Sequence, residues 1–129
     1  MLDHVSVPVA DLEVSAGFYD KVFEPLGLTR LAERERTIGF GKKYPEFWLN
    51  LRPGMSSAAE DTGFHFCLRA PSKQAVEAFH ELALANGGQS AGEPGEREAA
   101  MTTYFGAFIR DPDGNKICAY CFKPPKELS

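Results

Sequence analysis

The sequence contains an internal repeat, which limits the folds open to this chain more than any other feature. Shifted by 61 positions, the stretch LDHVSVPVADLEVSAGFYDKVFEPLG falls on GFHFCLRAPSKQAVEAFHELALANGG. His4 then falls on His65, and Phe18 falls on Phe79. Self-similarity at a fixed period is typical of two copies of one structural unit.

Each copy predicts a strand, a short turn and an amphipathic helix. Asp11 and Ser72 stand at equivalent positions, where their side chains can cap the two helix N-termini. Apolar residues follow each cap at helical spacing, which predicts one buried stripe per helix. His80 lies off the stripe of the second helix, so we expect its side chain to be solvated.

Extended segments follow each helix. They are predicted at 28–33, 36–41 and 46–52 in the first copy, and at 89–91, 104–110 and 115–122 in the second. The tetrapeptide DPDG at 111–114 is typical of a hairpin turn. The stretch 92–103 predicts a long and mobile loop.

These elements predict an α+β fold with two βαβββ modules in a single domain spanning residues 1–129. The first module covers about 1–52 and the second about 63–124. A polar linker at 53–62, rich in residues that break helices and strands, joins them.

Composition excludes several classes of protein. The chain has 129 residues and a net charge of -4, without a basic patch that would favour nucleic acid or an anionic membrane. It has no apolar run long enough for a membrane helix and no recognisable secretion signal. Its three cysteines fit a reducing compartment better than a disulfide framework. We therefore expect a cytoplasmic protein.

The chain resembles the vicinal oxygen chelate superfamily, which includes glyoxalase I, extradiol dioxygenases, fosfomycin-modifying enzymes and bleomycin-resistance proteins. The matching residues are DHVSVPVADLEVSAGFYDKVFEPLGL, GFHFCL and FGAFIRDPDGNKI. The resemblance implies an open barrel with its helices outside, enclosing a metal and a small ligand. It also implies a homodimer, in which the modules pair either within one chain or across the two chains.

The two repeated histidines are the first candidate metal ligands. Strand alternation places His4 on the face opposite Val5 and Val7, and the repeat places His65 likewise. Two imidazoles brought together by the repeat suit Zn, Fe, Mn, Co or Ni. The alternative is that both histidines end their strands and bond only to the backbone.

A third ligand is expected on the last strand, where metal enzymes of this superfamily usually carry a glutamate. This chain has Cys118 there, and an ungapped offset of 68 places Asn50 at the equivalent position of the first module, or Leu49 if the turns differ. The predicted metal set is therefore His4, His65 and Cys118, holding Zn, Ni, Mn or Fe. The alternative is a small buried Cys118 and no metal.

The sequence CAYC does not form a two-cysteine site. In a strand, Cys118 and Cys121 point to opposite faces and lie about 10 Å apart. A disulfide needs Cα atoms within about 7 Å, so the two cannot bridge.

Four further residues are expected to contact a small molecule: Trp48, Asn50, Arg69 and Tyr104. The aromatic side chains suit a flat or apolar ligand, and a guanidinium can hold a carboxylate or phosphate.

Three functions follow. The first is a metal-dependent lyase or dioxygenase, in which the metal polarises a substrate with adjacent oxygens. The second is a metal-free protein that binds or sequesters a small molecule, as bleomycin-resistance proteins do. The third is a partner-binding protein that only shares the fold.

Overall fold

A computed structural model describes residues 1–58, 61–98 and 102–122. The first module contains β1 (Val5–Val9), α1 (Leu12–Phe23), the short 3₁₀ turn η1 (Glu24–Leu26), β2 (Thr29–Glu33), β3 (Thr37–Gly41) and β4 (Pro45–Leu51). The second contains β5 (Phe66–Arg69), α2 (Lys73–Ala85), β6 (Gln89–Glu98), β7 (Thr103–Arg110) and β8 (Lys116–Phe122).

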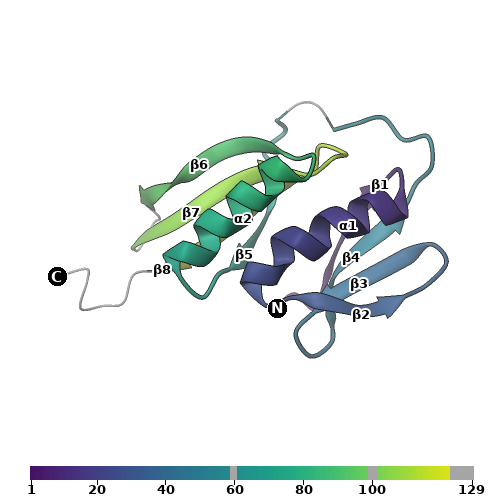
Figure 1. Ribbon diagram of the computed structural model, residues 1–129, viewed down its shortest axis with the longest axis horizontal. Coiled ribbons are helices and arrows are strands. Elements are labelled where there is room, and N and C mark those ends of the chain that lie inside the picture. The colour runs from purple at the N-terminus through teal and green to yellow at the C-terminus, as the bar shows by residue number, and fades with distance from the viewer. Residues whose placement is uncertain (59–60, 99–101, 123–129) are drawn as a thin grey trace.

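Each module forms one mixed four-stranded sheet. The strand orders are β1-β4-β3-β2 and β5-β8-β7-β6 (Figure 1). In both sheets the first strand runs parallel to the last, and the remaining neighbours are antiparallel. The predicted α+β fold with two βαβββ modules is therefore confirmed, with sheets that do not close into a complete barrel.

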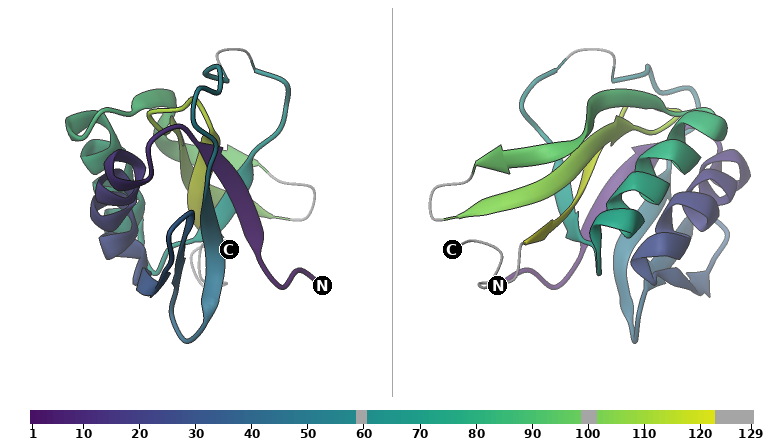
Figure 2. Two further views of the ribbon diagram at one scale, coloured as in Figure 1. Left: turned by 90° about the vertical axis from the view of Figure 1, so that its right-hand side faces the viewer. Right: turned by 60° about the vertical axis from the view of Figure 1, so that its left-hand side comes forward.

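Both helices lie on the same side of the strands, as Figure 2 shows. The predicted caps are present: Asp11 accepts a hydrogen bond from the Val14 amide at 3.0 Å, and Ser72 accepts one from Ala75 at 3.1 Å. In the described part of the chain, no helix is long and apolar enough to cross a membrane.

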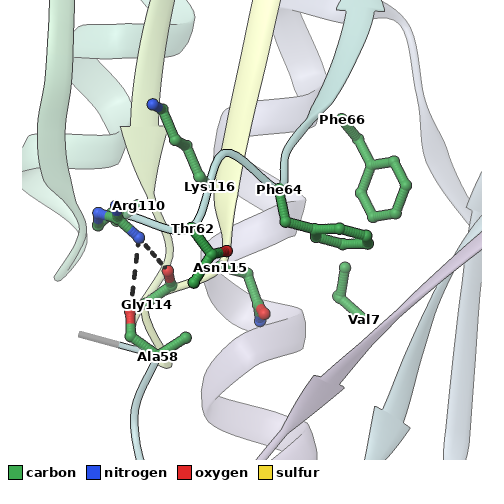
Figure 3. A pocket seen from close by; sticks show the side chains of 9 residues that line it. All are labelled: Val7, Ala58, Thr62, Phe64, Phe66, Arg110, Gly114, Asn115 and Lys116. Carbon is green, nitrogen blue, oxygen red and sulfur yellow. Dashed lines mark hydrogen bonds between the residues drawn. The ribbon is translucent and has the colours of Figure 1, made fainter. Parts of the chain in front are cut away.

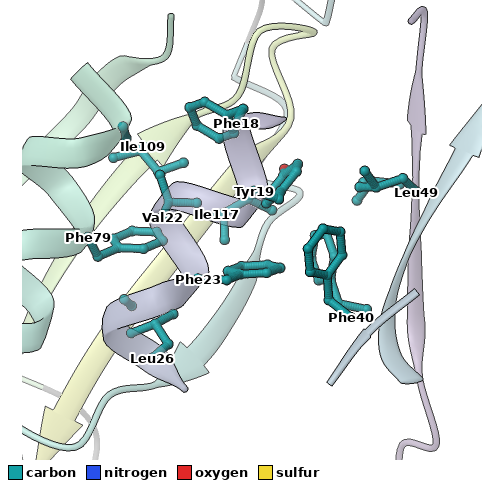
Figure 4. Packing of buried hydrophobic residues seen from close by; sticks show 14 of the residues in the cluster. Phe18, Tyr19, Val22, Phe23, Leu26, Phe40, Leu49, Phe79, Ile109 and Ile117 are labelled. Carbon is teal, nitrogen blue, oxygen red and sulfur yellow. The ribbon is translucent and has the colours of Figure 1, made fainter. Parts of the chain in front are cut away.

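Helix α1 contributes the aromatic centre of the core (Figure 4). The Tyr19 ring lies 4.9 Å from that of Phe23 and 5.2 Å from that of Phe47, between centroids. Phe23 in turn packs on Phe40 at 5.4 Å. All four side chains are almost completely buried, so the packing of this helix stabilises the first sheet.

The DPDG turn ties the second module to the first. The Tyr19 hydroxyl donates a 2.7 Å hydrogen bond to Asp111, and the Ser15 hydroxyl donates one of 3.0 Å to Asp113. Burial raises the pKa of Asp111, and burial beside that carboxylate raises the pKa of Tyr19. The phenol therefore stays protonated and remains a donor.

Two expectations were wrong. Strand β6 continues to Glu98 along β7, so the residues expected to begin the loop at 92–103 are a strand; 99–101 lie outside the described residues. Register shifts around Gly92 and Gly95 allow this pairing. His80 is only 5% exposed, because β6 covers that side of α2, and its Nε2 lies 2.7 Å from the Ser90 hydroxyl.

Candidate functional site

The candidate site lies on the face of each sheet that points away from the helices, called here the open face. Val7 and Leu49 are buried on the helix side, as the alternation predicts. Ser6 and Trp48, one position along, are opposite each other on the open face. In the second module, Cys67 occupies the equivalent place.

The two histidines lie one residue before β1 and β5, which confirms their equivalent positions in the repeat. Both are exposed. Nδ1 of His4 lies 2.7 Å from a carboxylate oxygen of Asp3, and Nδ1 of His65 lies 3.1 Å from the Gly63 carbonyl oxygen. The His65 ring also packs against Phe108, at 5.3 Å between centroids.

The strand register corrects the expected equivalence of Asn50 and Cys118. Cys118 lies opposite Cys67, whereas the repeat partner of Cys67, Ser6, lies opposite Trp48. Trp48 is therefore the counterpart of Cys118, two residues before Asn50. The ungapped offset failed because a register shift near Gly41 makes the two hairpins unequal.

The donor set does not match a site of histidines and carboxylates. The two equivalent last-strand positions hold an indole and a thiol, neither of which is a carboxylate. No group of three or more His, Cys, Asp or Glu side chains gathers within the residues that the structure describes. The assignment of a metal to His4, His65 and Cys118 stays a prediction.

The two thiols lie opposite each other on adjacent strands instead. Cys118 is fully buried and Cys67 is exposed. A hydrogen bond from the Cys118 thiol, together with the nearby Lys116 ammonium, lowers the pKa of Cys67. The same contact, followed by burial, raises the pKa of Cys118. Cys121 points to the other side of β8, as predicted, and pairs with Phe105 along the strands.

An aromatic and cationic group lies on the open face of the second sheet, beside the thiols. Tyr120 packs on Tyr104 at 5.4 Å and on Phe122 at 5.2 Å, between ring centroids. The Arg69 guanidinium lies 5.3 Å from the centre of the Phe122 ring. We call these four residues the Tyr120 cluster. Burial raises the pKa of Tyr104, so its phenol is a neutral donor at neutral pH.

Other cations on this face are already engaged. Arg97 donates hydrogen bonds to the carbonyl oxygens of Glu93, Gly95 and Gly106. Lys116 pairs with Asp61 at 3.2 Å. Within the described residues Arg69 has no such partner, so its charge is free for a ligand.

The predicted ligand contacts therefore divide between the modules. Arg69 and Tyr104 both belong to the Tyr120 cluster on the second sheet, whereas Trp48 and Asn50 lie on the first sheet. There the Arg34 guanidinium lies 5.2 Å from the Trp48 ring centre, and the Asn50 amide donates to the Ser6 hydroxyl. Tyr120 was not predicted as a site residue, although strand alternation puts it on the same face as Cys118.

Two hollows adjoin these faces. One is a groove where the modules meet, next to the Tyr120 cluster, and it is lined by Leu26, Leu28, Lys42, Glu46, Phe47, Cys67, Leu68 and Arg69. The other lies near the DPDG turn, where Figure 3 shows Arg110 directed at two carbonyl oxygens. These hydrogen bonds, 2.8 Å to the Gly114 oxygen and 3.4 Å to the Ala58 oxygen, stabilise the turn. The Arg110 guanidinium is therefore already engaged within the protein.

Comparison with known proteins identifies the class to which this fold and site belong. The chain belongs to the Glyoxalase/Bleomycin resistance protein/Dioxygenase superfamily, whose sequence pattern matches residues 1–119. This confirms the resemblance found in the sequence.

Two solved structures of this superfamily are similar to this chain. A glyoxalase/bleomycin resistance protein from Albidiferax ferrireducens T118 has a TM-score of 0.83 and 35% identity, covering 94% of this chain and 98% of that one. An enzyme of the same family from Burkholderia phytofirmans PsJN, at TM-score 0.72 and 17% identity over 94% and 98%, supports the fold alone.

A curated relative carries the name of an activity. Lactoylglutathione lyase GLX1 of Arabidopsis thaliana is 34% identical over 122 residues, which cover 86% of this chain and 40% of that protein. The chain therefore spans well under half the length of this relative.

Proposed function

We propose that this protein binds a small molecule with an aromatic or apolar body and a negatively charged group, on the open face of its second sheet. Binding would not require a metal held by His4 and His65. The observation that carries the proposal is the Tyr120 cluster: Arg69 lies over Phe122, which is one of three packed aromatic rings, and it has no ion-pair partner among the residues that the structure describes.

The cluster provides both parts of such a site. The rings of Tyr104 and Tyr120 give a surface on which a flat ligand can pack. The guanidinium gives directed donors for a carboxylate, sulfonate or phosphate. The groove that includes Arg69 and Cys67 extends this surface to the boundary between the modules.

Binding of 8-anilinonaphthalene-1-sulfonate, followed by its fluorescence, tests the proposal. This probe combines aromatic rings with a sulfonate. Arg69→Gln is expected to raise its dissociation constant roughly fivefold, as for loss of an exposed ion pair. Tyr104→Ala is expected to raise it roughly tenfold through loss of ring packing.

Two matched variants control for charge and for aromatic content. Lys21→Gln removes one positive charge from the exposed side of α1, and Tyr44→Ala removes an exposed ring from the β3–β4 turn. Both should leave probe affinity within twofold of the wild type. Equal effects of Arg69→Gln and Lys21→Gln would show that the probe does not occupy the Tyr120 cluster.

The predicted homodimer belongs to the same proposal. The open faces lie away from the helices, so a second copy could supply the opposite wall of the site. In this proposal the ligand is a small molecule, and the protein partner is a second copy of this chain.

A metal-dependent lyase or dioxygenase is the second candidate, favoured by the name of the Arabidopsis relative and by the equivalent histidines. Turnover of an α-oxo thiohemiacetal of glutathione, measured with Zn, Ni, Mn or Fe(II), tests the lyase. Activity that His4→Ala/His65→Ala abolishes would favour this candidate over metal-free binding.

A further inference from the structure

Two cysteines that are far apart in the sequence lie directly opposite each other on the second sheet. Cys67 on β5 pairs with Cys118 on β8 in the parallel register. Neighbouring strands are about 4.8 Å apart, which is within the Cα separation of about 4.4–6.8 Å found in disulfides. Because directly opposed residues point to the same face of a sheet, the two thiols are direct neighbours across β5 and β8.

The two thiols differ in access. Cys67 is exposed and lines the groove between the modules, whereas Cys118 has no exposed surface. A dissolved oxidant therefore meets Cys67 first, while Cys118 is already in contact with it. This arrangement has an attacking thiol and a resolving thiol in adjacent positions.

We propose that Cys67 and Cys118 form a reversible disulfide across β5 and β8 when the protein meets hydrogen peroxide. This redox site does not depend on the proposed ligand. The third cysteine, Cys121, takes no part, because it points to the opposite face of β8.

The chemistry balances in two steps. The Cys67 thiolate attacks one peroxide oxygen, which forms a sulfenic acid and releases hydroxide; the proton lost from Cys67 converts the hydroxide to water. The Cys118 sulfur then attacks the sulfenic sulfur, its own proton leaves with the hydroxyl group as a second water, and the S–S bond forms. Two electrons pass from the thiols to the peroxide, and a dithiol such as dithiothreitol reverses the reaction.

Mass spectrometry of the whole chain after peroxide treatment tests the proposal. We expect a loss of about 2 Da and the disappearance of two of the three free thiols. Trypsin does not cleave between Lys123 and Pro124, so it leaves Cys118 and Cys121 on one peptide, residues 117–126, and the peptide map is made on Cys121→Ser. A peptide pair linked through Cys67 and restored by dithiothreitol is the expected result.

Matched variants distinguish a Cys67–Cys118 disulfide from oxidation of a single cysteine or of Cys121. Cys121→Ser should oxidise like the wild type, and Cys67→Ser should show no loss of 2 Da. Cys118→Ser should likewise show no loss of 2 Da. Because Cys118 is buried, this variant can fail to fold, but the wild-type measurement does not depend on it. Gain of oxygen on Cys67 with Cys118 still free, or a link that includes Cys121, would overturn the proposal.

Discussion

Replacing Tyr19 by alanine is expected to lower the free energy of unfolding by about 3–5 kcal/mol, as for other buried aromatic side chains. Its ring is completely buried and contacts Phe23, Phe40 and Phe47. Its hydroxyl also joins α1 of the first module to Asp111 of the second. Urea unfolding followed by circular dichroism measures the change.

Two further variants separate the contribution of the Tyr19 hydroxyl from that of its ring, and the effect of burial from that of the residue type. Tyr19→Phe keeps the ring and removes only the hydrogen bond to a buried carboxyl group, so a loss of about 1–3 kcal/mol is expected. Tyr44→Ala removes an exposed tyrosine and should change stability by less than about 0.5 kcal/mol. If Tyr19→Ala and Tyr44→Ala were equally stable, the described core would be incorrect.

Gly41→Ala is expected to destabilise the protein by about 1–3 kcal/mol, because the space at this position is already occupied. A Cβ atom there would overlap the Tyr44 carbonyl oxygen in the β3–β4 hairpin. That oxygen belongs to the backbone and cannot move without shifting the turn. Thermal and urea unfolding measure the loss.

The same substitution at Gly17 is the control. Gly17 lies within α1, and nothing is within 4 Å of a Cβ placed there. Alanine is the better helix former, so Gly17→Ala should stabilise the protein by about 0.5–1 kcal/mol. Effects of the same sign at both positions would contradict the described hairpin.

The module plan could be predicted because its signals are local. Caps such as Asp11 and Ser72 and the apolar stripes lie within about 25 residues of each strand, and the repeat shows each signal twice. The length of β6 could not be predicted in this way, because it depends on pairing with β7. The burial of His80 could not be predicted either, because it depends on the packing of β6 on α2.

The site was predicted in part for a similar reason. Strand alternation is enough to place Cys67 and Arg69 on one face of β5, and the register places Cys118 on the same face. The register of β4 was missed by two residues, because a shift near Gly41 leaves no clear sequence signal. The contact of Cys67 with Cys118 joins residues from the two ends of the second module, which a local pattern cannot show.

The family alone does not decide between the candidate functions, because one fold supports several chemistries. Two features of this chain bear on the choice. Trp48 and Cys118 stand at the equivalent last-strand positions, and Arg69 lies over an aromatic ring without an ion-pair partner in the described part of the chain. These residues favour ligand binding over chemistry at a metal held by histidines and carboxylates.

The metal content of untagged protein tests the central claim, that the open face binds its ligand without a metal held by the two histidines. Wild type and His4→Ala/His65→Ala are incubated with Zn, Ni, Mn or Fe(II), passed through gel filtration and measured by mass spectrometry. Both proteins are expected to hold the same amount of metal, well below one equivalent per chain. About one equivalent in the wild type that is lost in the double variant would contradict it.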